Sequence, residues 1–403
     1  MGAVKMAEGI WWVGAIDWEL RGFHGLATPE GSTYNSYLVV GDKVALIDAV
    51  KTDAGATLLR NVSEIVDPAR IDYVISNHSE PDHSGALAQV LEAAPDARLL
   101  ASKEGVKRLG DMFPSQWEIE AVGDGDRISL GNLSLHFINT PLLHWPETMM
   151  TWCPERGVLF SCDPYGAHIA TTERFADEVG IDYVLAYTRT YFAYLIAAYR
   201  SAMKKAASKT ASLDIKMIAP SHGPIWRDGL KLLLEEYRRW IELELEDRAT
   251  IIYGSMWGGT RKMAEAIAEG LKDGGLDVRA FNVELADPSD VIAESFLSRV
   301  VLIGSPTFES GVYPPVEAFI PWLRIPRDKS RQVAVFGSFG WSGGAARRLQ
   351  DILRSEGYRV NDEPLTIRFF PDADAVGHCR EYGRRIAEWS QGERGEEAKT
   401  AAE

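Results

Sequence analysis

Short apolar runs separated by turn residues fill the first part of the chain. They are NSYLVV, VALIDA, IDYVISN, ARLLAS, LSLHFIN and GVLFSC. Runs of this length, rich in Val, Ile and Leu and bounded by turns, are typical of β-strands. Because some of them arrive in pairs before the next helical segment, they predict mixed sheets rather than one parallel sheet. A long, heavily charged helical stretch, RDGLKLLLEEYRRWIELELEDR, is expected to end this part of the chain.

From Ala249 onward the pattern changes. The apolar runs ATIIYG, LDVRAFNV, RVVLIG and RQVAVFGS alternate with amphipathic helices, and in the first helix Met263, Ile267 and Leu271 recur on one face. Alternating β and α segments predict a doubly wound parallel sheet. We therefore expect an α/β protein with domains at residues 1–248 and 249–391, followed by a disordered tail of small and charged residues at 392–403.

The composition narrows the possible partners. The chain has 403 residues, a length that predicts two or three domains, and its net charge of -15 with a pI near 5.1 would repel nucleic acid and anionic membranes. No run of 18 apolar residues and no signal peptide occurs, so we expect neither a membrane span nor export. The three cysteines form no CxxC pair, which argues against a disulfide framework or a thiolate metal cage and favours a reducing cytoplasm.

Metal-ligating side chains are concentrated in ISNHSEPDHSG, residues 75–85, directly after a predicted strand. This loop carries His78, Glu80, Asp82 and His83. Imidazole and carboxylate groups suit zinc, iron or manganese, and they suit a pair of metals if the carboxylates divide between them. A pair needs further ligands, including a bridging oxygen. Other candidates at strand ends or in turns are His144, Asp163, His168 and His222, with Asp163 placed as a bridge would be.

A second candidate site follows the strand ATIIYG, in the segment SMWGGTRKMAEAI. Its small and hydroxyl-bearing residues and the helix that begins there would bind an anion through backbone N–H groups and the helix dipole. Neither the P-loop pattern nor the GxGxxG fingerprint is present. Two later strand ends, GSPTFESGVYP and GSFGWSGGA, would lie at the same sheet edge and offer Phe308, Trp341 and Trp257 to a planar ring. Together the loops predict a mononucleotide site.

The motifs HSEPDHSG, LLHWPE, LFSCDPYG and PSHGPIW together resemble the metallo-β-lactamase-like domain of the flavodiiron proteins. The resemblance implies an αββα sandwich. It also implies two non-haem irons, one held by His78, Glu80 and His144, the other by Asp82, His83 and His222, with Asp163 bridging. Glu80 stands where hydrolases of this superfamily usually have histidine, and its anionic oxygen favours redox iron over hydrolytic zinc. In the RGFHG stretch, the resemblance places His24 near the open face of the metals, as a source of protons.

The segments SMWGGT and FGSFGWSGG are similar to the flavodoxin module of the same family. The similarity implies a flavodoxin-like domain that binds FMN. The phosphate would lie on Ser255, Met256, Trp257, Gly258, Gly259 and Thr260. The ribityl chain and ring would lie on Pro306, Thr307, Phe308, Ser338, Phe339, Gly340, Trp341, Ser342, Gly343 and Gly344.

The sequence departs from the family at two places. Phe308, Glu309 and Ser310 stand where the family often has His-Asn-Asn, and Glu309 would lower the flavin potential or disfavour an acidic donor. The segment 191–194 reads Tyr-Phe-Ala-Tyr instead of Tyr-Tyr-Ala-Asn. The second change lies in an active-site region of the family and bears on the preference between O2 and NO.

The resemblance implies an oxidoreductase that passes electrons through FMN to the diiron site and reduces O2 to water, NO to N2O, or both, protecting an anaerobe or microaerobe. The donor would be a separate rubredoxin or a reduced deazaflavin, because the chain has no CxxC pair for a fused rubredoxin. The basic residues Arg380, Arg384 and Arg385 would dock an acidic rubredoxin. The resemblance also implies a head-to-tail homodimer or a dimer of dimers, with the flavin of one subunit beside the irons of the other.

Two other functions fit the same residues. A binuclear zinc hydrolase with an attached flavodoxin module would use a metal-bound hydroxide on an ester or thioester. An electron carrier with a vestigial metal site would have no catalysis. Metal analysis separates the hydrolase from the oxidoreductase, and replacement of Asp163 by Asn without loss of reductase activity would favour the carrier.

Overall fold

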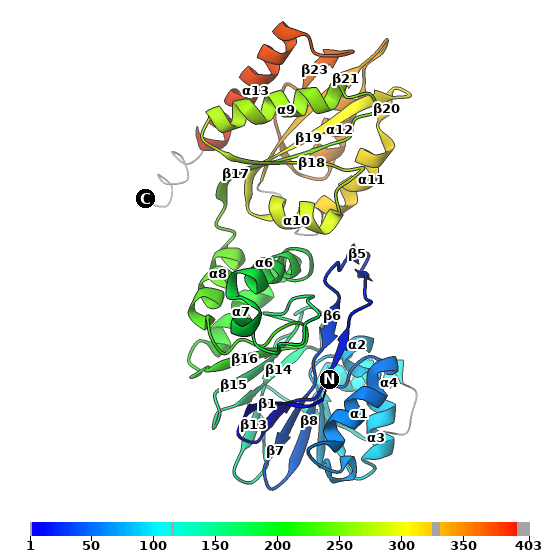
Figure 1. Cartoon of the computed structure of the whole chain (residues 1–403), viewed down its shortest axis with the longest axis vertical. Coiled ribbons are helices and arrows are strands. Elements are labelled where there is room, and N and C mark those ends of the chain that lie inside the picture. Colours follow the sequence, from blue (N-terminus) through cyan, green and yellow to red (C-terminus); the bar gives the residue numbers. More distant parts are fainter. Residues whose placement is uncertain (1, 114–116, 325–330, 393–403) are drawn as a thin grey trace. The chain divides into compact units, whose positions relative to one another are not determined.

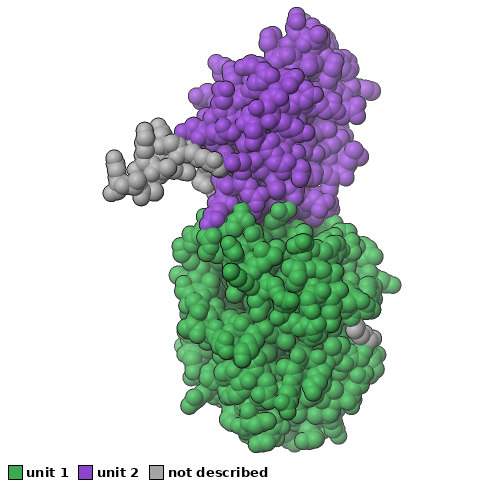
Figure 2. All heavy atoms as spheres, turned by 60° about the vertical axis from the view of Figure 1, so that its left-hand side comes forward, with its two compact units in different colours: residues 1–242 green, residues 243–403 purple. Residues whose placement is uncertain are grey.

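The computed structural model describes residues 2–113, 117–324 and 331–392. The chain forms two compact units, Met1–Glu242 and Leu243–Glu403, shown in green and purple in Figure 2. The tail expected at residues 392–403 lies outside the described residues, apart from Gly392, which ends the last helix. Within the described ranges, no helix has both the length and the apolar character that a membrane span requires.

Two mixed sheets form the first unit. The first has the order β1-β2-β7-β8-β9-β10-β11 and is antiparallel as far as β8 and parallel beyond it. Its strands are β1 (Val4–Ala7), β2 (Ile10–Trp12), β7 (Tyr37–Val40), β8 (Val44–Ile47), β9 (Tyr73–Ser76), β10 (Arg98–Ser102) and β11 (Ile119–Val122). The second is antiparallel except for its last pair. Its strands are β12 (Arg127–Ser129), β13 (Ser134–Asn139), β14 (Met149–Cys153), β15 (Val158–Cys162) and β16 (Met217–Pro220).

The alternation of side chains along the strands builds the layers of this unit. In β7, Tyr37 and Val39 point into the core shared with Phe137 and Phe160 of the second sheet, while Leu38 points into the core beneath the helices. Those helices are α1 (Gly55–Ser63), α3 (Leu87–Ala93) and α4 (Lys103–Met112). On the side of the second sheet lie α6 (Ile181–Tyr191), α7 (Arg200–Thr210) and α8 (Leu230–Glu242) (Figure 1). The αββα sandwich and the mixed sheets are as predicted.

The second unit is a parallel sheet with helices on both faces. The strand order is β18-β17-β19-β21-β22, the order typical of flavodoxin-like folds, and β23 pairs with the carboxyl half of β21. The strands are β17 (Glu246–Tyr253), β18 (Asp277–Asn282), β19 (Ser298–Phe308), β21 (Gln332–Phe339), β22 (Arg359–Val360) and β23 (Leu365–Arg368), and β20 (Gly311–Val312) forms a hairpin with β19.

The helices of this unit bury their apolar faces as the sequence predicts. Met263, Ile267 and Leu271 of α9 (Gly259–Asp273) lie in one core with residues of α13 (Ala373–Gly392). The opposite core is covered by α10 (Pro288–Phe296), α11 (Pro314–Leu323) and α12 (Ala345–Ser355). Gly270 of α9 and Gly383 of α13 let the two helices meet backbone to backbone, because a Cβ at Gly383 would collide with the carbonyl oxygen of Ile267.

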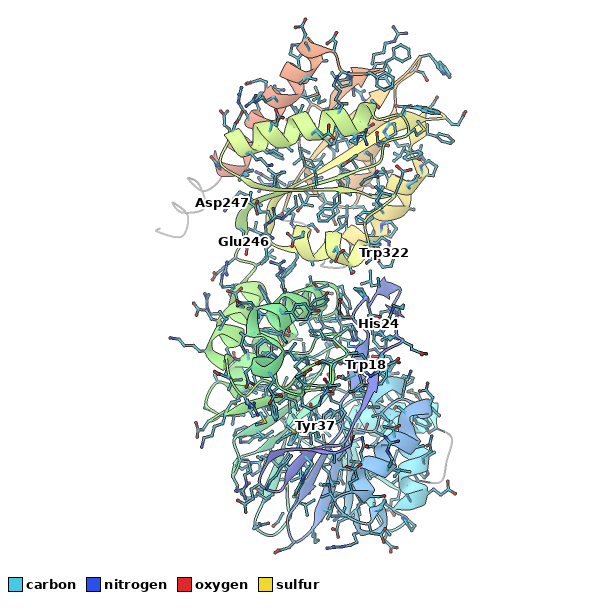
Figure 3. The ribbon with its side chains drawn as sticks, viewed as in Figure 1. Trp18, His24, Tyr37, Glu246, Asp247 and Trp322 are labelled. Carbon is cyan, nitrogen blue, oxygen red and sulfur yellow. The ribbon has the colours of Figure 1, made fainter. Side chains whose placement is uncertain are left out.

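The sequence predicted one long helical stretch over RDGLKLLLEEYRRWIELELEDR, and this prediction is wrong for its last part. The helix α8 ends at Glu242, and Leu243 adopts a left-handed conformation with φ 54°. Glu246 and Asp247 already belong to β17 (Figure 3), because Glu246 pairs with Ser298 at the start of β19. Tertiary strand pairing therefore overrides the helical propensity of the ELELEDR segment. The exact domain boundary expected after residue 248 stays a prediction.

Candidate metal cluster and flavin cavity

Four separate loops bring the predicted metal-binding residues to one edge of the first unit. His78 and Glu80 follow β9, and Asp82 and His83 lie in the short helix α2 (Pro81–Ser84). His144 lies between β13 and β14, Asp163 directly follows β15, and His222 follows β16. The carboxyl ends of β9, β15 and β16 thus position most of the set, as the sequence predicts for binding loops.

One half of the cluster gathers around Glu80. The Nε2 atoms of His78 and His144 lie 3.2 Å and 3.0 Å from Glu80 Oε2. Both Nε2 atoms also lie 3.6 Å from Asp163 Oδ2. His78, His144 and Asp163 therefore form a group that could hold one metal ion, and Glu80 Oε2 lies beside both imidazoles.

The other half gathers around Asp82. His222 Nε2 and His83 Nε2 lie 3.2 Å and 3.6 Å from Asp82 Oδ2. They lie 3.6 Å and 3.3 Å from Asp163 Oδ1. Asp163 therefore turns one carboxylate oxygen toward each half, which is the arrangement of a bridging carboxylate.

The electrostatics of the cluster favour cations. Burial favours the neutral form of Glu80, but hydrogen bonds with His144, His24 and His78 outweigh it and hold its pKa well below the ordinary range. Burial likewise opposes ionisation of Asp163, and the charges of His83 and the other histidines hold its pKa well below the ordinary range. Both carboxylates are therefore anionic at neutral pH.

Four buried polar atoms of the cluster lack a hydrogen-bond partner among the described residues. They are Asp163 Oδ2, both carboxylate oxygens of Asp82, and His83 Nε2. Buried polar atoms are nearly always hydrogen-bonded or bound to an ion. Unpartnered ligand atoms that face a buried, negatively charged space fit a site built for metal ions.

A small hairpin borders the cluster. It consists of β4 (Gly22–Phe23) and β5 (Leu26–Ala27), with His24 at its turn (Figure 3). His24 Nε2 lies 2.9 Å from Glu80 Oε1, and burial opposes its protonation, but Glu80 and two further carboxylates raise the pKa of His24. The Phe23 ring packs 4.2 Å from the His24 ring and 6.0 Å from that of His222. The hairpin thus places one titratable and one apolar side chain against the metal site.

His168, also a candidate from the sequence, lies beside the cluster and not in either half of it. Its Nδ1 lies 2.7 Å from Ser32 Oγ, and its ring centroid lies 5.0 Å from that of His222. Burial holds the pKa of His168 well below the ordinary value, so the ring is neutral.

Two residues outside the predicted set of site residues contact the cluster; the sequence analysis did not single out Glu147 and named Tyr191 only within the segment 191–194. Glu147 accepts a hydrogen bond from His78 Nδ1 at 2.8 Å. The hydroxyl of Tyr191 donates to Asp163 Oδ1 at 3.0 Å. Glu147 lies in the quoted motif LLHWPE, where an acid three residues after a candidate histidine was the available signal. The position of Tyr191 depends on how α6 folds back over the sheet, which the local sequence does not reveal.

The second unit has a cavity of about 370 Å³ at the carboxyl ends of its strands, a size typical of small-molecule sites. It is lined by thirteen of the sixteen predicted flavin-site residues, namely Ser255, Met256, Trp257, Gly259, Thr260, Pro306, Thr307, Phe308, Ser338, Phe339, Gly340, Trp341 and Ser342. The hydroxyls of Thr260 and Ser338 lie 2.9 Å apart and join two of the loops.

The remaining predicted residues have other positions. Gly258 precedes α9 in a left-handed conformation with φ 89°, which a side chain would strain. Gly343 and Gly344 line a neighbouring cavity of about 510 Å³ that shares Thr307, Ser338 and Phe339 with the first. Both glycines thus lie beside the flavin cavity and not in its wall.

Four further residues line the flavin cavity; the sequence analysis named Glu309 and Ser310 only as a departure near the flavin and did not single out Phe369 and Phe370. Phe369 and Phe370 follow β23, and Glu309 and Ser310 form the two-residue turn between β19 and β20. An aromatic pair directly after a strand was the available signal for the first two. Glu309 and Ser310 both have positive φ, as this kind of tight hairpin turn requires.

Comparison with known proteins gives the same division of the chain. Residues 33–223 match the ODP family beta lactamase family, and residues 251–383 match the flavodoxin family. The nitric oxide reductase of Moorella thermoacetica is 38% identical, over 95% of this chain and 98% of that protein. The solved rubredoxin oxygen:oxidoreductase from the anaerobe Desulfovibrio gigas superposes with a TM-score of 0.92 at 32% identity, covering 97% and 99% of the two chains. The flavodiiron protein from Giardia intestinalis superposes with a TM-score of 0.94 at 30% identity, covering 97% of each chain.

The chain belongs to the flavodiiron protein family. The predicted resemblance and fold class are thereby confirmed.

The structure places the two residues of segment 191–194 that depart from the flavodiiron pattern. Phe192 packs its ring 5.1 Å from that of Tyr237 and 5.4 Å from that of Trp240, so this change is accommodated in the hydrophobic core. Tyr194 instead lies parallel to His168, with ring centroids 6.4 Å apart, on the side of the metal cluster. Of these two changed residues, Tyr194 is therefore the one on the side of the metal cluster.

The basic residues expected to dock a donor have partners within their own unit. Arg380 and Arg384 both donate to Asp273, at 2.7 Å and 2.9 Å, and together they lower the pKa of Asp273 to about 2. Arg385 lies over the ring of Tyr382 at 5.8 Å. The first two guanidinium groups thus serve the α9–α13 contact, which weakens their interpretation as a docking site for an acidic flavodiiron donor.

Proposed function

We propose that this chain is an oxidoreductase that passes electrons from an external donor through FMN to a non-haem diiron site, which reduces O2 to water, NO to N2O, or both. The observation that carries the proposal is the position of Asp163 between the two halves of the cluster. A hydrolase needs no attached electron store, whereas a redox diiron site does, and the second unit has a cavity at the place where flavodoxin-like folds bind their ligand.

The two ions would each have three ligands of their own. One would be held by His78, Glu80 and His144, the other by Asp82, His83 and His222, with Asp163 bridging. Iron is favoured because Glu80 adds a hard anionic oxygen, which stabilises higher oxidation states. The unpartnered atoms of Asp82, His83 and Asp163 support this ligand set, since each would gain a metal bond.

FMN would bind in the cavity of the second unit. Its phosphate would lie where the backbone N–H groups at the start of α9 meet the hydroxyls of Ser255 and Thr260. The aromatic rings of Trp257, Trp341 and Phe369 surround the same cavity and suit the planar ring system. Bound FMN would supply two electrons and the two ferrous ions the rest, so that O2 is reduced fully.

The chain's own residues would orient the site and deliver protons. Tyr191 donates to Asp163 Oδ1 and so fixes the plane of the bridging carboxylate. His24 lies within hydrogen-bond distance of Glu80 on the hairpin that borders the cluster, where it would hold a proton for the reduction. Phe23, on the same hairpin, lies with its ring centroid 6.0 Å from that of His222, where it would limit the entry of water.

We further propose the donor, assembly and location that family membership suggests. The donor would be rubredoxin, as the name of the Desulfovibrio gigas enzyme states for that protein, or a reduced deazaflavin. The protein would work as a head-to-tail homodimer or a dimer of dimers. Three buried free cysteines fit a reducing cytoplasm.

Anaerobic titration of the purified protein tests the function. We expect two irons and one FMN per chain, bleaching of the flavin by reduced rubredoxin or deazaflavin, and rapid reoxidation by O2 or NO. Two zinc ions with ester or thioester hydrolysis, and no oxygen consumption, would replace this function with that of a zinc hydrolase. Comparison of the O2 and NO rates assigns the substrate.

A further inference from the structure

One carboxylate near the cluster has no place in the proposed ligand set. Glu147 is only 2% exposed, and its side chain lies behind His78, on the side away from the metals. Burial of an ionised carboxylate is costly unless hydrogen bonds compensate for it. A group of this kind is retained where its charge or its geometry is needed.

The hydrogen bonds of Glu147 converge on a single oxygen. Oε1 accepts from His78 Nδ1 at 2.8 Å, from Ser79 Oγ at 2.6 Å and from Ser79 N at 3.2 Å. The backbone oxygen of Glu147 accepts from Ser102 Oγ at 2.6 Å, which anchors the residue to the end of β10. Oε2 has no hydrogen-bond partner among the described residues. Three donors on Oε1, and no described acceptor near Oε2 that could take a proton from it, fit an ionised carboxylate behind His78.

The contact fixes which nitrogen of His78 faces the cluster. Because Oε1 can only accept, His78 Nδ1 must carry a proton, and the lone pair of a neutral ring is then on Nε2, toward Glu80 and Asp163. A negative charge behind the ring also makes Nε2 a stronger electron donor.

In the other half of the cluster, the histidine Nδ1 atoms have different neighbours. His222 Nδ1 lies 2.7 Å from the backbone oxygen of Thr33, an uncharged acceptor. His83 Nδ1 lies 3.9 Å from Asp48 Oδ2, beyond hydrogen-bond distance. His78 is therefore the histidine with a direct bond to a charged acceptor, among those whose Nδ1 contacts the structure describes.

We propose that Glu147 is a positioning residue that strengthens metal binding in one half of the cluster, the half made by His78, Glu80 and His144. This inference rests on the proposed ligand set. It adds that the two metal positions differ in their affinity for the metal ion. The half backed by Glu147 binds its ion more tightly, because among the described contacts neither His83 nor His222 has a direct hydrogen bond from Nδ1 to a carboxylate. Asp48 lies behind His83, but at 3.9 Å from its Nδ1.

Cobalt(II) binding to the metal-depleted full-length protein tests the inequality. Cobalt(II) absorbs in the visible range when it is bound by nitrogen and oxygen ligands, so competition with a chelator gives both dissociation constants without any assay of turnover. The variant Glu147→Gln keeps the volume and the hydrogen-bond acceptor for His78 but removes the charge. We expect one dissociation constant to rise roughly 10- to 100-fold and the other to stay the same.

Matched variants separate this role from general stability. Glu155→Gln makes the same change at an exposed carboxylate that also accepts from the hydroxyl and N–H of one serine, Ser134, and it should leave both constants unchanged. Glu147→Asp keeps the charge but withdraws it from His78, and it should weaken the same site even if Glu147→Gln fails to fold. His144→Ala and His222→Ala each remove one cobalt band and so identify the affected half.

The outcomes are distinct. If both Glu147 variants bind two cobalt ions with the wild-type constants, or weaken both sites equally together with the melting temperature of the metal-free protein, the inference is wrong. If the wild-type protein itself binds fewer than two cobalt ions, the proposed diiron site fails first. Selective loss at the half containing His144 supports the role of Glu147.

Discussion

Asp163 is the residue on which the proposed chemistry depends most. It follows β15 directly, is 1% exposed, and turns one oxygen toward each half of the cluster. Its only described hydroxyl donor is Tyr191. A carboxylate in this position holds two cations at a short separation and offsets part of their mutual repulsion.

Replacement of Asp163 by Asn should remove the bridging charge at nearly constant volume. We expect the purified variant to lose at least one of its irons and its O2 or NO reduction to fall by roughly 100-fold or more, because a neutral amide binds iron poorly. Iron analysis and gas consumption measure both effects. Tyr191→Phe is the control, since it removes only the hydroxyl that donates to Asp163; it should keep both irons and cost roughly 10-fold in activity. Retention of both irons and full activity in Asp163→Asn would show that Asp163 does not bridge.

The stability of the iron-free protein should depend on pH through His78. Burial opposes protonation of this ring, but Glu147 and Glu80 raise its pKa to about 9, above the ordinary 6.5. A raised folded-state pKa means that the stabilisation is complete below about pH 6.5 and is lost as the pH rises through about 9, by at most about 3 kcal/mol. His83 acts in the same direction.

Thermal unfolding of chelator-treated protein between pH 6 and 10 measures this loss. In iron-loaded protein the metal would occupy Nε2 of His78, so the same rise in pH should have little effect. An equal decline in both forms would assign the pH dependence to groups outside the cluster.

At the scale of single residues, the sequence predicted what spacing and residue type can encode. HSEPDH places four side chains of metal-ligating type in six positions, and the structure brings His144, Asp163 and His222 to the same cluster. The sequence did not predict the role of Glu147, because that role depends on which ring nitrogen of His78 the carboxylate contacts. That is a property of three-dimensional packing, and no local pattern specifies it.

At the scale of elements, strand pairing and close helix contacts determine the structure where the local sequence pattern does not predict it. The ELELEDR segment has helical composition, but α8 ends at Glu242, and β17 begins at Glu246, which pairs with Ser298. Phe369 and Phe370 line the flavin cavity because β23 ends at the same sheet edge as β17 and β21. The sequence did predict the alternating β and α segments and the buried face of α9, since these follow directly from periodicity.

The contact between α9 and α13 gives a prediction about stability. Gly383→Ala would place a methyl group against the carbonyl oxygen of Ile267 in α9, so the two helices must separate. We expect the free energy of unfolding to fall by about 1–3 kcal/mol, the usual cost of overpacking. Gly377→Ala is the control, because it lies in the same helix with no atom within 4 Å of the new Cβ, and it should stabilise by about 0.5–1 kcal/mol. Denaturant unfolding measures both, and a Gly383→Ala variant as stable as Gly377→Ala would contradict the close contact.

At the scale of the whole molecule, the chain combines two modules with different tasks. The first unit has the metal cluster and the second has the flavin cavity, and each has its own hydrophobic cores. The proposed reaction requires electron transfer from the flavin to the metal cluster. The proposed head-to-tail dimer makes this transfer an event between subunits, which has consequences for mixed dimers.

Co-expression of two inactive variants tests transfer between subunits. Asp163→Asn would disable the irons, and Gly259→Val would disable the flavin site, because its side chain would meet the carbonyl oxygen of Phe369. In a head-to-tail dimer, each mixed dimer retains one intact flavin beside one intact diiron site, so the random mixture should regain about a quarter of the wild-type rate. If transfer occurs within one chain, no chain in the mixture has both sites and the rate stays near zero. Tags that differ between the variants allow the mixed dimer to be purified, and its rate should then approach half that of the wild-type dimer.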